Sequence, residues 1–117
     1  MSIKISPSIL GGSFSNIEKV ILDLNQSKAE YIHFDVMDGD FVPNLTFGPQ
    51  FISDVRKFSN KIFDVHLMIN RVEKFLDDYI EAGSDIITFH IEISEDIGNI
   101  INKIKAKGIK CGLAIKP

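Results

Sequence analysis

The sequence has almost no cysteine and no long apolar run, and each absence excludes a class of protein. Cys111 is the single cysteine among 117 residues, so the chain cannot form an internal disulfide. It lies in the apolar run IKCGLAI, which predicts a buried structural thiol. No apolar stretch approaches the ~20 residues of a membrane span. The start MSIKISPSIL also lacks the basic flank and apolar stretch of a signal peptide. We therefore expect a cytoplasmic protein with no membrane partner.

A basic patch and a glycine-rich phosphate loop are missing as well. The formal net charge is −3, and the basic residues are scattered along the chain. The densest group falls at the end of a predicted helix, where cations complement the helix dipole: Lys103, Lys105, Lys107 and Lys110. This pattern predicts no nucleic-acid partner. Gly11-Gly12 is too short for a phosphate loop, which disfavours a doubly wound nucleotide-binding domain.

What the sequence does contain is one unit, repeated: a short β-branched run, a polar turn and an amphipathic helix. The predicted strands are residues 3–10, 31–36, 62–67, 85–90 and 109–115. Predicted helices lie between them, and capping pairs are expected at Ser15 with Glu18 and at Asn70 with Glu73. Such alternation predicts an α/β fold with parallel strands and right-handed crossovers. A doubly wound sheet and a (β/α)8 barrel both begin in this way.

Polar side chains gather on one face of two of these strands. His33, Asp35 and Met37 alternate with apolar residues in the second strand, so the three share a face. His66 and Met68 do the same in the third strand. The carboxyl ends of parallel strands are where α/β folds build their sites. Two imidazoles and a carboxylate there favour a divalent transition metal such as Zn²⁺, Fe²⁺ or Mn²⁺. The alternatives are hydrogen-bonded core histidines and, for the methionines, core filler.

These residues also carry a family resemblance that covers the whole chain. The segments SPSIL, HFDVMDGDFVPNLTFGP, VHLMI, TFHIE and GLAIKP resemble ribulose-phosphate 3-epimerase, in the family's order. Members of that family are (β/α)8 barrels that interconvert D-ribulose 5-phosphate and D-xylulose 5-phosphate in the pentose phosphate pathway. A closed barrel needs at least about 200 residues. We therefore expect residues 1–117 to be the N-terminal half of a barrel, roughly four βα units plus a fifth strand.

The resemblance implies a role for each matching residue. His33, Asp35 and His66 would bind a divalent metal, with zinc expected first and Fe²⁺, Mn²⁺ or Co²⁺ as alternatives. Asp35 would also act as one of two acid/base catalysts. Ser8 and His66 would contact the sugar phosphate. Met37 and Met68 would form part of a methionine cluster beside the reacting carbons.

The resemblance also places essential parts of the family's site in later strands that this sequence does not contain. These are the second catalytic aspartate, the third methionine and the phosphate-binding loops. Lys116 also stands where the family is expected to have asparagine. The alternatives are therefore an inactive half barrel, or an epimerase of a related sugar phosphate such as allulose 6-phosphate.

Unpaired strand edges on a half barrel predict a homo-oligomer. His90 and Glu92 suggest either a second metal pair, or an active-site wall or hydrogen-bonding role, and we favour the latter reading.

Overall fold

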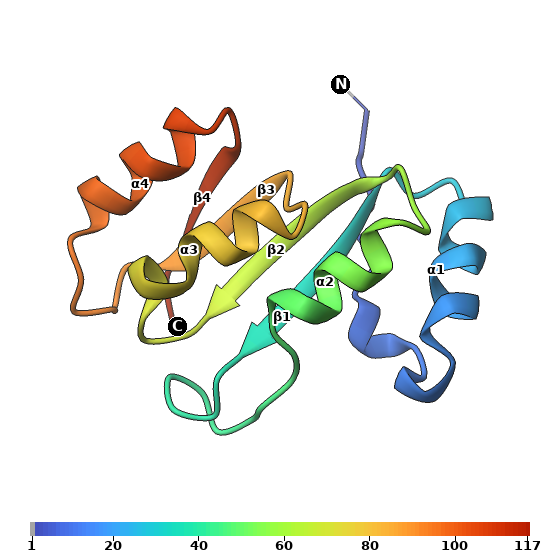
Figure 1. Cartoon of the computed structure of the whole chain (residues 1–117), viewed down its shortest axis with the longest axis horizontal. Coiled ribbons are helices and arrows are strands. Elements are labelled where there is room, and N and C mark those ends of the chain that lie inside the picture. Colours follow the sequence, from blue (N-terminus) through green and yellow to red (C-terminus); the bar gives the residue numbers. More distant parts are fainter. Residues whose placement is uncertain (1) are drawn as a thin grey trace.

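Four parallel strands form a sheet in the order β1-β2-β3-β4 in the computed structural model, which describes residues 2–117 (Figure 1). The strands are β1 (Tyr31–Met37), β2 (Ile62–Met68), β3 (Ile86–His90) and β4 (Lys110–Ala114). The helices are α1 (Ile17–Gln26), α2 (Pro49–Arg56), α3 (Val72–Glu81) and α4 (Ile97–Ala106), preceded by the 3₁₀ turns η1 (Ile9–Gly11) and η2 (Phe14–Asn16). Across residues 2–117, every helix is too short or too polar to cross a membrane.

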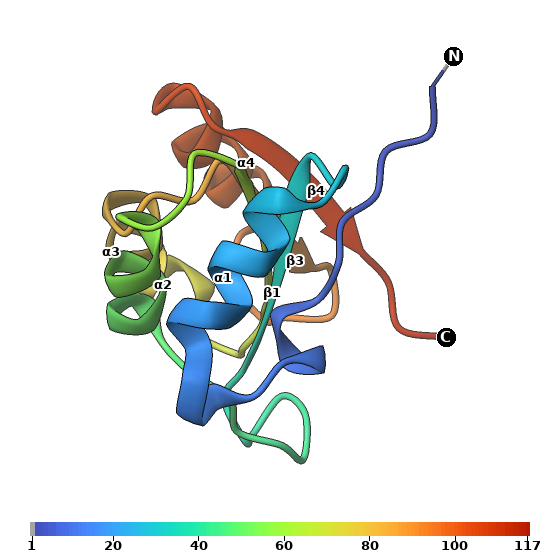
Figure 2. The same ribbon diagram turned by 90° about the vertical axis from the view of Figure 1, so that its right-hand side faces the viewer.

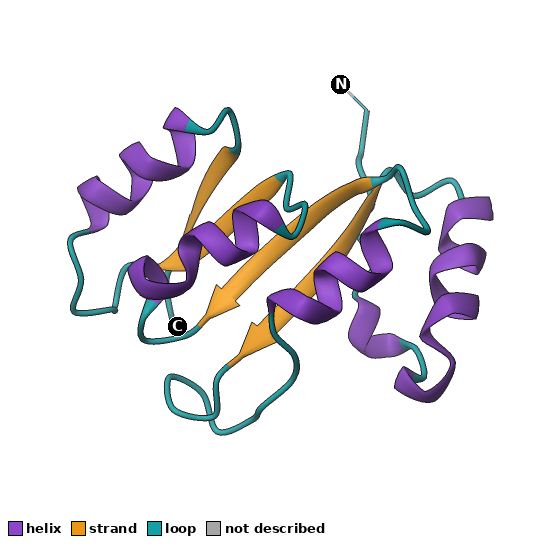
Figure 3. Cartoon of the chain, in the orientation of Figure 1, coloured by secondary structure: helices purple, strands orange, loops and turns teal. Residues whose placement is uncertain are grey.

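The helices all cover one face of the sheet, and the other face stays open (Figures 2 and 3). Burial alternates along β1 and β2, so every second side chain points into the helix-covered core. Phe34, Phe63 and Phe89 are fully buried there, and the rings of the first two lie 4.6 Å apart. The intervening side chains are half-buried on the open face, which is where the predicted polar residues lie. Cys111 is half-buried and packs against the core.

The predicted first strand, residues 3–10, is wrong as a regular strand. The segment touches β1 through a single parallel bridge between Ser8 and His33, and the His33 amide donates to the Pro7 carbonyl at 2.8 Å. Pro7 has no N–H to extend a ladder. The Ser8 hydroxyl then accepts from the Leu10 amide at 3.2 Å and starts η1, so the chain turns away from β1. The alternation of four parallel strands with helices is confirmed.

Both predicted capping pairs are also wrong, because their side chains have other partners. α1 begins after η2, and Ser15 Oγ lies 2.8 Å from Ser13 Oγ. α3 begins after Arg71, and Glu73 Oε1 accepts from Lys103 Nζ at 2.6 Å. The side-chain amide of Asn70 donates to Asp40 Oδ2 at 2.6 Å, and its backbone N–H donates to Asp38 Oδ2 at 2.8 Å; both contacts tie the start of α3 to the loop after β1.

Candidate functional site

The site lies on the open face of the sheet, where the register of β1 and β2 aligns the predicted residues in layers. The register pairs are His33 with Asp64, Asp35 with His66, and Met37 with Met68. The two side chains of each pair lie on the same face of the sheet, because residues in register on neighbouring parallel strands point the same way. The two methionines form the layer nearest the carboxyl ends of the strands, directly beyond Asp35 and His66.

His33, Asp35 and His66 form a compact cluster that can bind a metal. One ligand atom from each residue lies within 4.8 Å of the others. Asp35 Oδ1 is 2.9 Å from His33 Nε2 and 3.3 Å from His66 Nδ1. Two imidazole nitrogens and one carboxylate oxygen suit Zn²⁺ and its divalent neighbours. The structure therefore brings together the three residues that the sequence suggested as ligands.

Ser8 joins this cluster from outside the sheet. Its hydroxyl donates to Asp35 Oδ2 at 3.1 Å, so the two oxygens of Asp35 have different partners. The single bridge that links Ser8 to β1 places it there. The side chain of Ser8 thus holds Asp35 in one orientation.

Each histidine of the cluster is held at its far nitrogen by a residue of the next strand. Asp64 Oδ2 lies 2.8 Å from His33 Nδ1 and also accepts from Ser6 Oγ at 3.0 Å. His90 Nε2 lies 2.8 Å from His66 Nε2. Metal-bound histidines are usually fixed by a hydrogen bond at the nitrogen away from the metal. Both nitrogens that face Asp35 are therefore oriented for ligation.

Asp64 is a residue that the sequence analysis missed. The signal was present, because Asp64 lies two residues before His66 and therefore on the same face of β2. What the sequence could not supply is the register that sets it opposite His33. The hydrogen-bonding role preferred for His90 is confirmed by its contact with His66.

Hydrogen bonds and charges within the site shift the pKa values of its histidine and aspartate side chains. Hydrogen bonds to Asp35 and then to Asp64 raise the pKa of His33 to about 9, although partial burial opposes the shift. The hydrogen bond with His33, followed by that with His66, holds the pKa of Asp35 well below its usual range. The His33 hydrogen bond likewise lowers the pKa of Asp64. Asp35 is therefore a carboxylate at neutral pH.

The loop between β1 and α2 lies at the carboxyl end of the strands, where the Phe41 ring is 5.0 Å from the His90 ring. Asp38 Oδ1 accepts from the backbone N–H groups of Asp40 and Phe41 at 2.9 and 2.7 Å, which forms a turn directly after β1. Gly39 has a φ of 76°, a conformation that glycine adopts without strain. Lys116 Nζ lies 3.8 Å above the Phe41 ring and donates to the Phe41 carbonyl. Lys116 thus holds this loop against the end of the chain.

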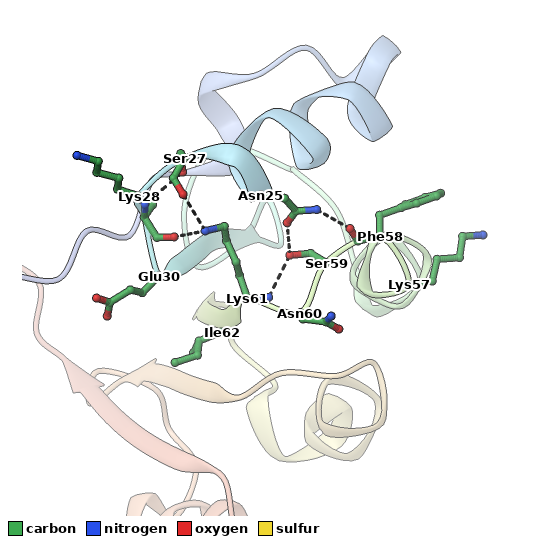
Figure 4. A pocket seen from close by; sticks show the side chains of 11 residues that line it. Asn25, Ser27, Lys28, Glu30, Lys57, Phe58, Ser59, Asn60, Lys61 and Ile62 are labelled. Atoms are coloured by element: carbon green, nitrogen blue, oxygen red, sulfur yellow. Dashed lines mark hydrogen bonds between the residues drawn. The ribbon is translucent and has the colours of Figure 1, made fainter.

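A cavity of about 700 Å³ lies at the opposite end of the sheet, where α1 and α2 end (Figure 4). Its polar groups satisfy one another: Lys61 Nζ donates to the carbonyls of Ser27 and Ala29, and Ser59 Oγ donates to Asn25 Oδ1 at 2.6 Å. This end precedes the strands, whereas sites in such folds form after them. The His33–Asp35–His66 cluster remains the candidate site.

Comparisons with known proteins agree with the geometry. The profile of the "Ribulose-phosphate 3 epimerase family" matches residues 4–117. A ribulose-phosphate 3-epimerase from Rhodobacter capsulatus is 45% identical over 116 residues, covering 99% of this chain and 51% of the relative. The enzyme of that name from Treponema pallidum is 39% identical, with 99% and 53% covered. The one from Bacillus subtilis is also 39% identical, with 98% and 53% covered.

The chain spans about half the length of the curated relatives it matches. Its four parallel strands and their helices correspond to half of the family's (β/α)8 barrel. Together, the profile match over nearly every residue and the identity to these relatives show that the chain belongs to the ribulose-phosphate 3-epimerase family.

Proposed function

We propose that this chain carries the metal-binding half of a cytoplasmic epimerase that interconverts D-ribulose 5-phosphate and D-xylulose 5-phosphate. The observation that carries the proposal is the His33–Asp35–His66 cluster in a chain of this family. The donor atoms point to one place on the open face, and their far nitrogens are already held. A divalent cation, with zinc favoured, would be bound by these three residues.

Asp35 is the proposed proton carrier. Inverting the carbon next to a ketone requires one proton to leave from one side and another to arrive on the opposite side. The lowered pKa of Asp35 keeps the side chain ionised at neutral pH, so both of its oxygens are free of a proton. Ser8 holds its second oxygen, which orients the carboxylate. A bound divalent cation would supply Lewis-acid stabilisation of the negative charge that develops on the substrate oxygens.

Met37 and Met68 are proposed to line the site beside the reacting carbons, and Ser8 and His66 to contact the substrate. The methionines lie one register layer beyond Asp35 and His66, toward the carboxyl ends of the strands. Polarisable thioethers there would exclude water from the developing charge without donating a proton. Hydrophobic neighbours of this kind strengthen electrostatic interactions by lowering the local dielectric.

A second candidate is that these 117 residues bind metal and substrate but do not complete the epimerisation. It is favoured by the coverage of only about half of each relative. In the three-residue cluster, Asp35 is the single carboxylate. One carboxylate can remove a proton from one side, whereas inversion needs a donor on the other side.

A coupled assay of D-ribulose 5-phosphate epimerisation with added Zn²⁺ or Mn²⁺ tests both candidates. The same samples should be incubated in deuterated water, and exchange at the reacting carbon should be followed by NMR. Epimerisation supports the full activity, and exchange without epimerisation supports the one-sided site. Asp35→Asn should abolish either signal, because an amide cannot accept the proton. The same assay with six-carbon sugar phosphates tests whether the chain belongs instead to an epimerase of a related sugar phosphate such as allulose 6-phosphate.

A variant at a carboxylate away from the site serves as the negative control. Asp54→Asn changes an exposed carboxylate on α2 and should leave both signals unchanged. If the wild-type chain binds Zn²⁺ yet shows neither exchange nor epimerisation, the activity does not belong to these residues alone. If Asp35→Asn retains exchange, the proposed proton carrier is wrong.

A further inference from the structure

A second cavity, of about 490 Å³, lies where the loop after β1 meets the start of α3 (Figure 1). Apolar side chains of both segments form its walls, among them Leu45, Phe47 and Phe75. Val36 also lines it and is 2% exposed on the helix-covered face of β1, opposite to the face that carries Asp35. The cavity is therefore separate from the candidate site, and its volume falls in the range of small-molecule sites.

One polar side chain, that of Tyr79, reaches this cavity from inside the protein. Tyr79 lines the cavity and is only 4% exposed. Side chains of an α-helix lean toward its N-terminus, so the Tyr79 ring points along α3 toward Phe75 and the loop. Its hydroxyl makes no hydrogen bond within residues 2–117, where His90 Nδ1 is the one fully enclosed polar side-chain atom without a partner. The phenol oxygen is therefore not enclosed, and the cavity is the space that it faces.

This hydroxyl offers a hydrogen bond rather than a charge. Burial raises the pKa of Tyr79 to about 12, with the charges of Asp78 and Asp38 adding to the shift, so the phenol keeps its proton at neutral pH. Buried tyrosine hydroxyls usually have a hydrogen-bond partner. A molecule in the cavity that presents an acceptor, such as a carbonyl oxygen, would supply that partner.

The charged residues around the cavity favour an uncharged ligand. Two carboxylates, those of Asp38 and Asp40, and one guanidinium, that of Arg71, line it. This balance disfavours an anion such as a sugar phosphate. The carboxylates are not free for a cation either, because Asp38 accepts from three backbone N–H groups and Asp40 Oδ2 accepts from the Asn70 side chain at 2.6 Å. A buried charge on the ligand would therefore lack a partner, which is costly.

We propose that this cavity binds an uncharged aromatic molecule, which accepts a hydrogen bond from the Tyr79 hydroxyl and packs its ring against Leu45, Phe47 and Phe75. Leu45 is 73% exposed and Phe75 is 39% exposed, so a bound ring would remove apolar surface from water. Aromatic rings gain further from offset or edge-to-face contacts with phenylalanine. The proposed ligand and its contacts do not depend on the proposed metal centre.

A pair of matched probes tests the proposal on the full 117-residue chain without metal. Acetophenone carries a carbonyl acceptor on an aromatic ring, and ethylbenzene has the same ring and a similar shape without the acceptor. Binding is followed by ¹H–¹⁵N chemical-shift titration, in which the amides of residues 36–48 and 69–79 report on the cavity. Tyr79→Phe removes the hydroxyl and keeps the ring. Tyr31→Phe, at the other tyrosine of the sequence and outside the cavity, is the matched control.

We expect acetophenone to bind the wild type and Tyr31→Phe equally and to bind Tyr79→Phe about 10-fold more weakly, as the loss of one hydrogen bond requires. Ethylbenzene should lose no affinity in Tyr79→Phe. Equal binding of acetophenone to the wild type and Tyr79→Phe overturns the proposal. So does a titration without saturable shifts in the two cavity segments, which would mean that water alone satisfies the phenol. If Tyr79→Phe does not fold, Phe75→Ala replaces it and must weaken the binding of both probes, and unchanged affinities would again overturn the proposal.

Discussion

Asp35 is the residue on which the candidate site converges, because its two oxygens are divided between different partners. Oδ1 faces both histidines of the cluster, and Oδ2 accepts from Ser8. The carboxylate is one-fifth exposed, so it is accessible from the open face and yet fixed in orientation. The two roles proposed for Asp35, binding a cation and carrying a proton, both require a carboxylate that is accessible and held in a fixed orientation.

Asp64 provides the first prediction at this scale. Its carboxylate holds the far nitrogen of His33, so Asp64→Asn keeps a hydrogen-bond acceptor but removes the charge that favours the ligating tautomer. We expect Zn²⁺ affinity to fall about 10- to 100-fold, measured by competition titration with a chromogenic chelator. Asp23→Asn, at an exposed carboxylate on α1, is the matched control and should bind as wild type does. Equal affinities for the two variants would show that Asp64 does not support the site.

At the scale of the elements, the helices and strands could be predicted because their apolar spacing reports directly on burial. The alternation along β1 places His33 and Asp35 on one face, and that much follows from a period of two. The partners of the histidines could not be predicted, since the contacts of Asp64 and His90 depend on the register between strands. The wrong prediction of a capping pair at Asn70 and Glu73 has a similar cause. Glu73 accepts a hydrogen bond from Lys103 of α4, and a contact between two helices cannot be predicted from local residue spacing.

The helix-covered face supplies the next prediction, through the phenol of Tyr79 in α3. Tyr79 is 4% exposed, and burial raises its pKa to about 12, with Asp78 and Asp38 adding to the shift. In the unfolded chain the phenol ionises near its ordinary pKa of about 10. Its contribution to stability is therefore fully present below pH 10 and is lost as the pH rises toward 12.

Tyr79→Phe tests this at the same position. Urea unfolding of the wild type should lose roughly 2 kcal/mol more than the variant between pH 10 and 12, because only the wild type must bury a group that would otherwise ionise. Below pH 9 the difference between the two proteins should be constant. Parallel curves over the whole alkaline range would mean that Tyr79 ionises in the folded chain as easily as in the unfolded one.

At the scale of the whole molecule, the two edges of the sheet differ. The N-terminal segment covers part of the β1 edge through the bridge between Ser8 and His33 (Figure 2). The outer edge of β4 has no strand beside it among residues 2–117. Leu113 of β4 shares a register layer with the buried Phe89 but is 49% exposed. Ile115, just beyond, is 71% exposed. An uncovered edge with apolar side chains invites pairing with another strand.

We therefore expect these 117 residues on their own to self-associate through the β4 edge. Multi-angle light scattering over a range of concentrations should show a mass that rises above the 13.1 kDa of one chain. Leu113→Lys should shift the distribution toward the monomer, because a charged side chain on an edge strand opposes strand pairing. Leu22→Lys, on an equally exposed leucine of α1, is the control and should leave the distribution unchanged. A wild-type chain that stays monomeric at every concentration would show that this edge does not attract a second copy, and an equal effect of both variants would assign the association to general hydrophobicity instead.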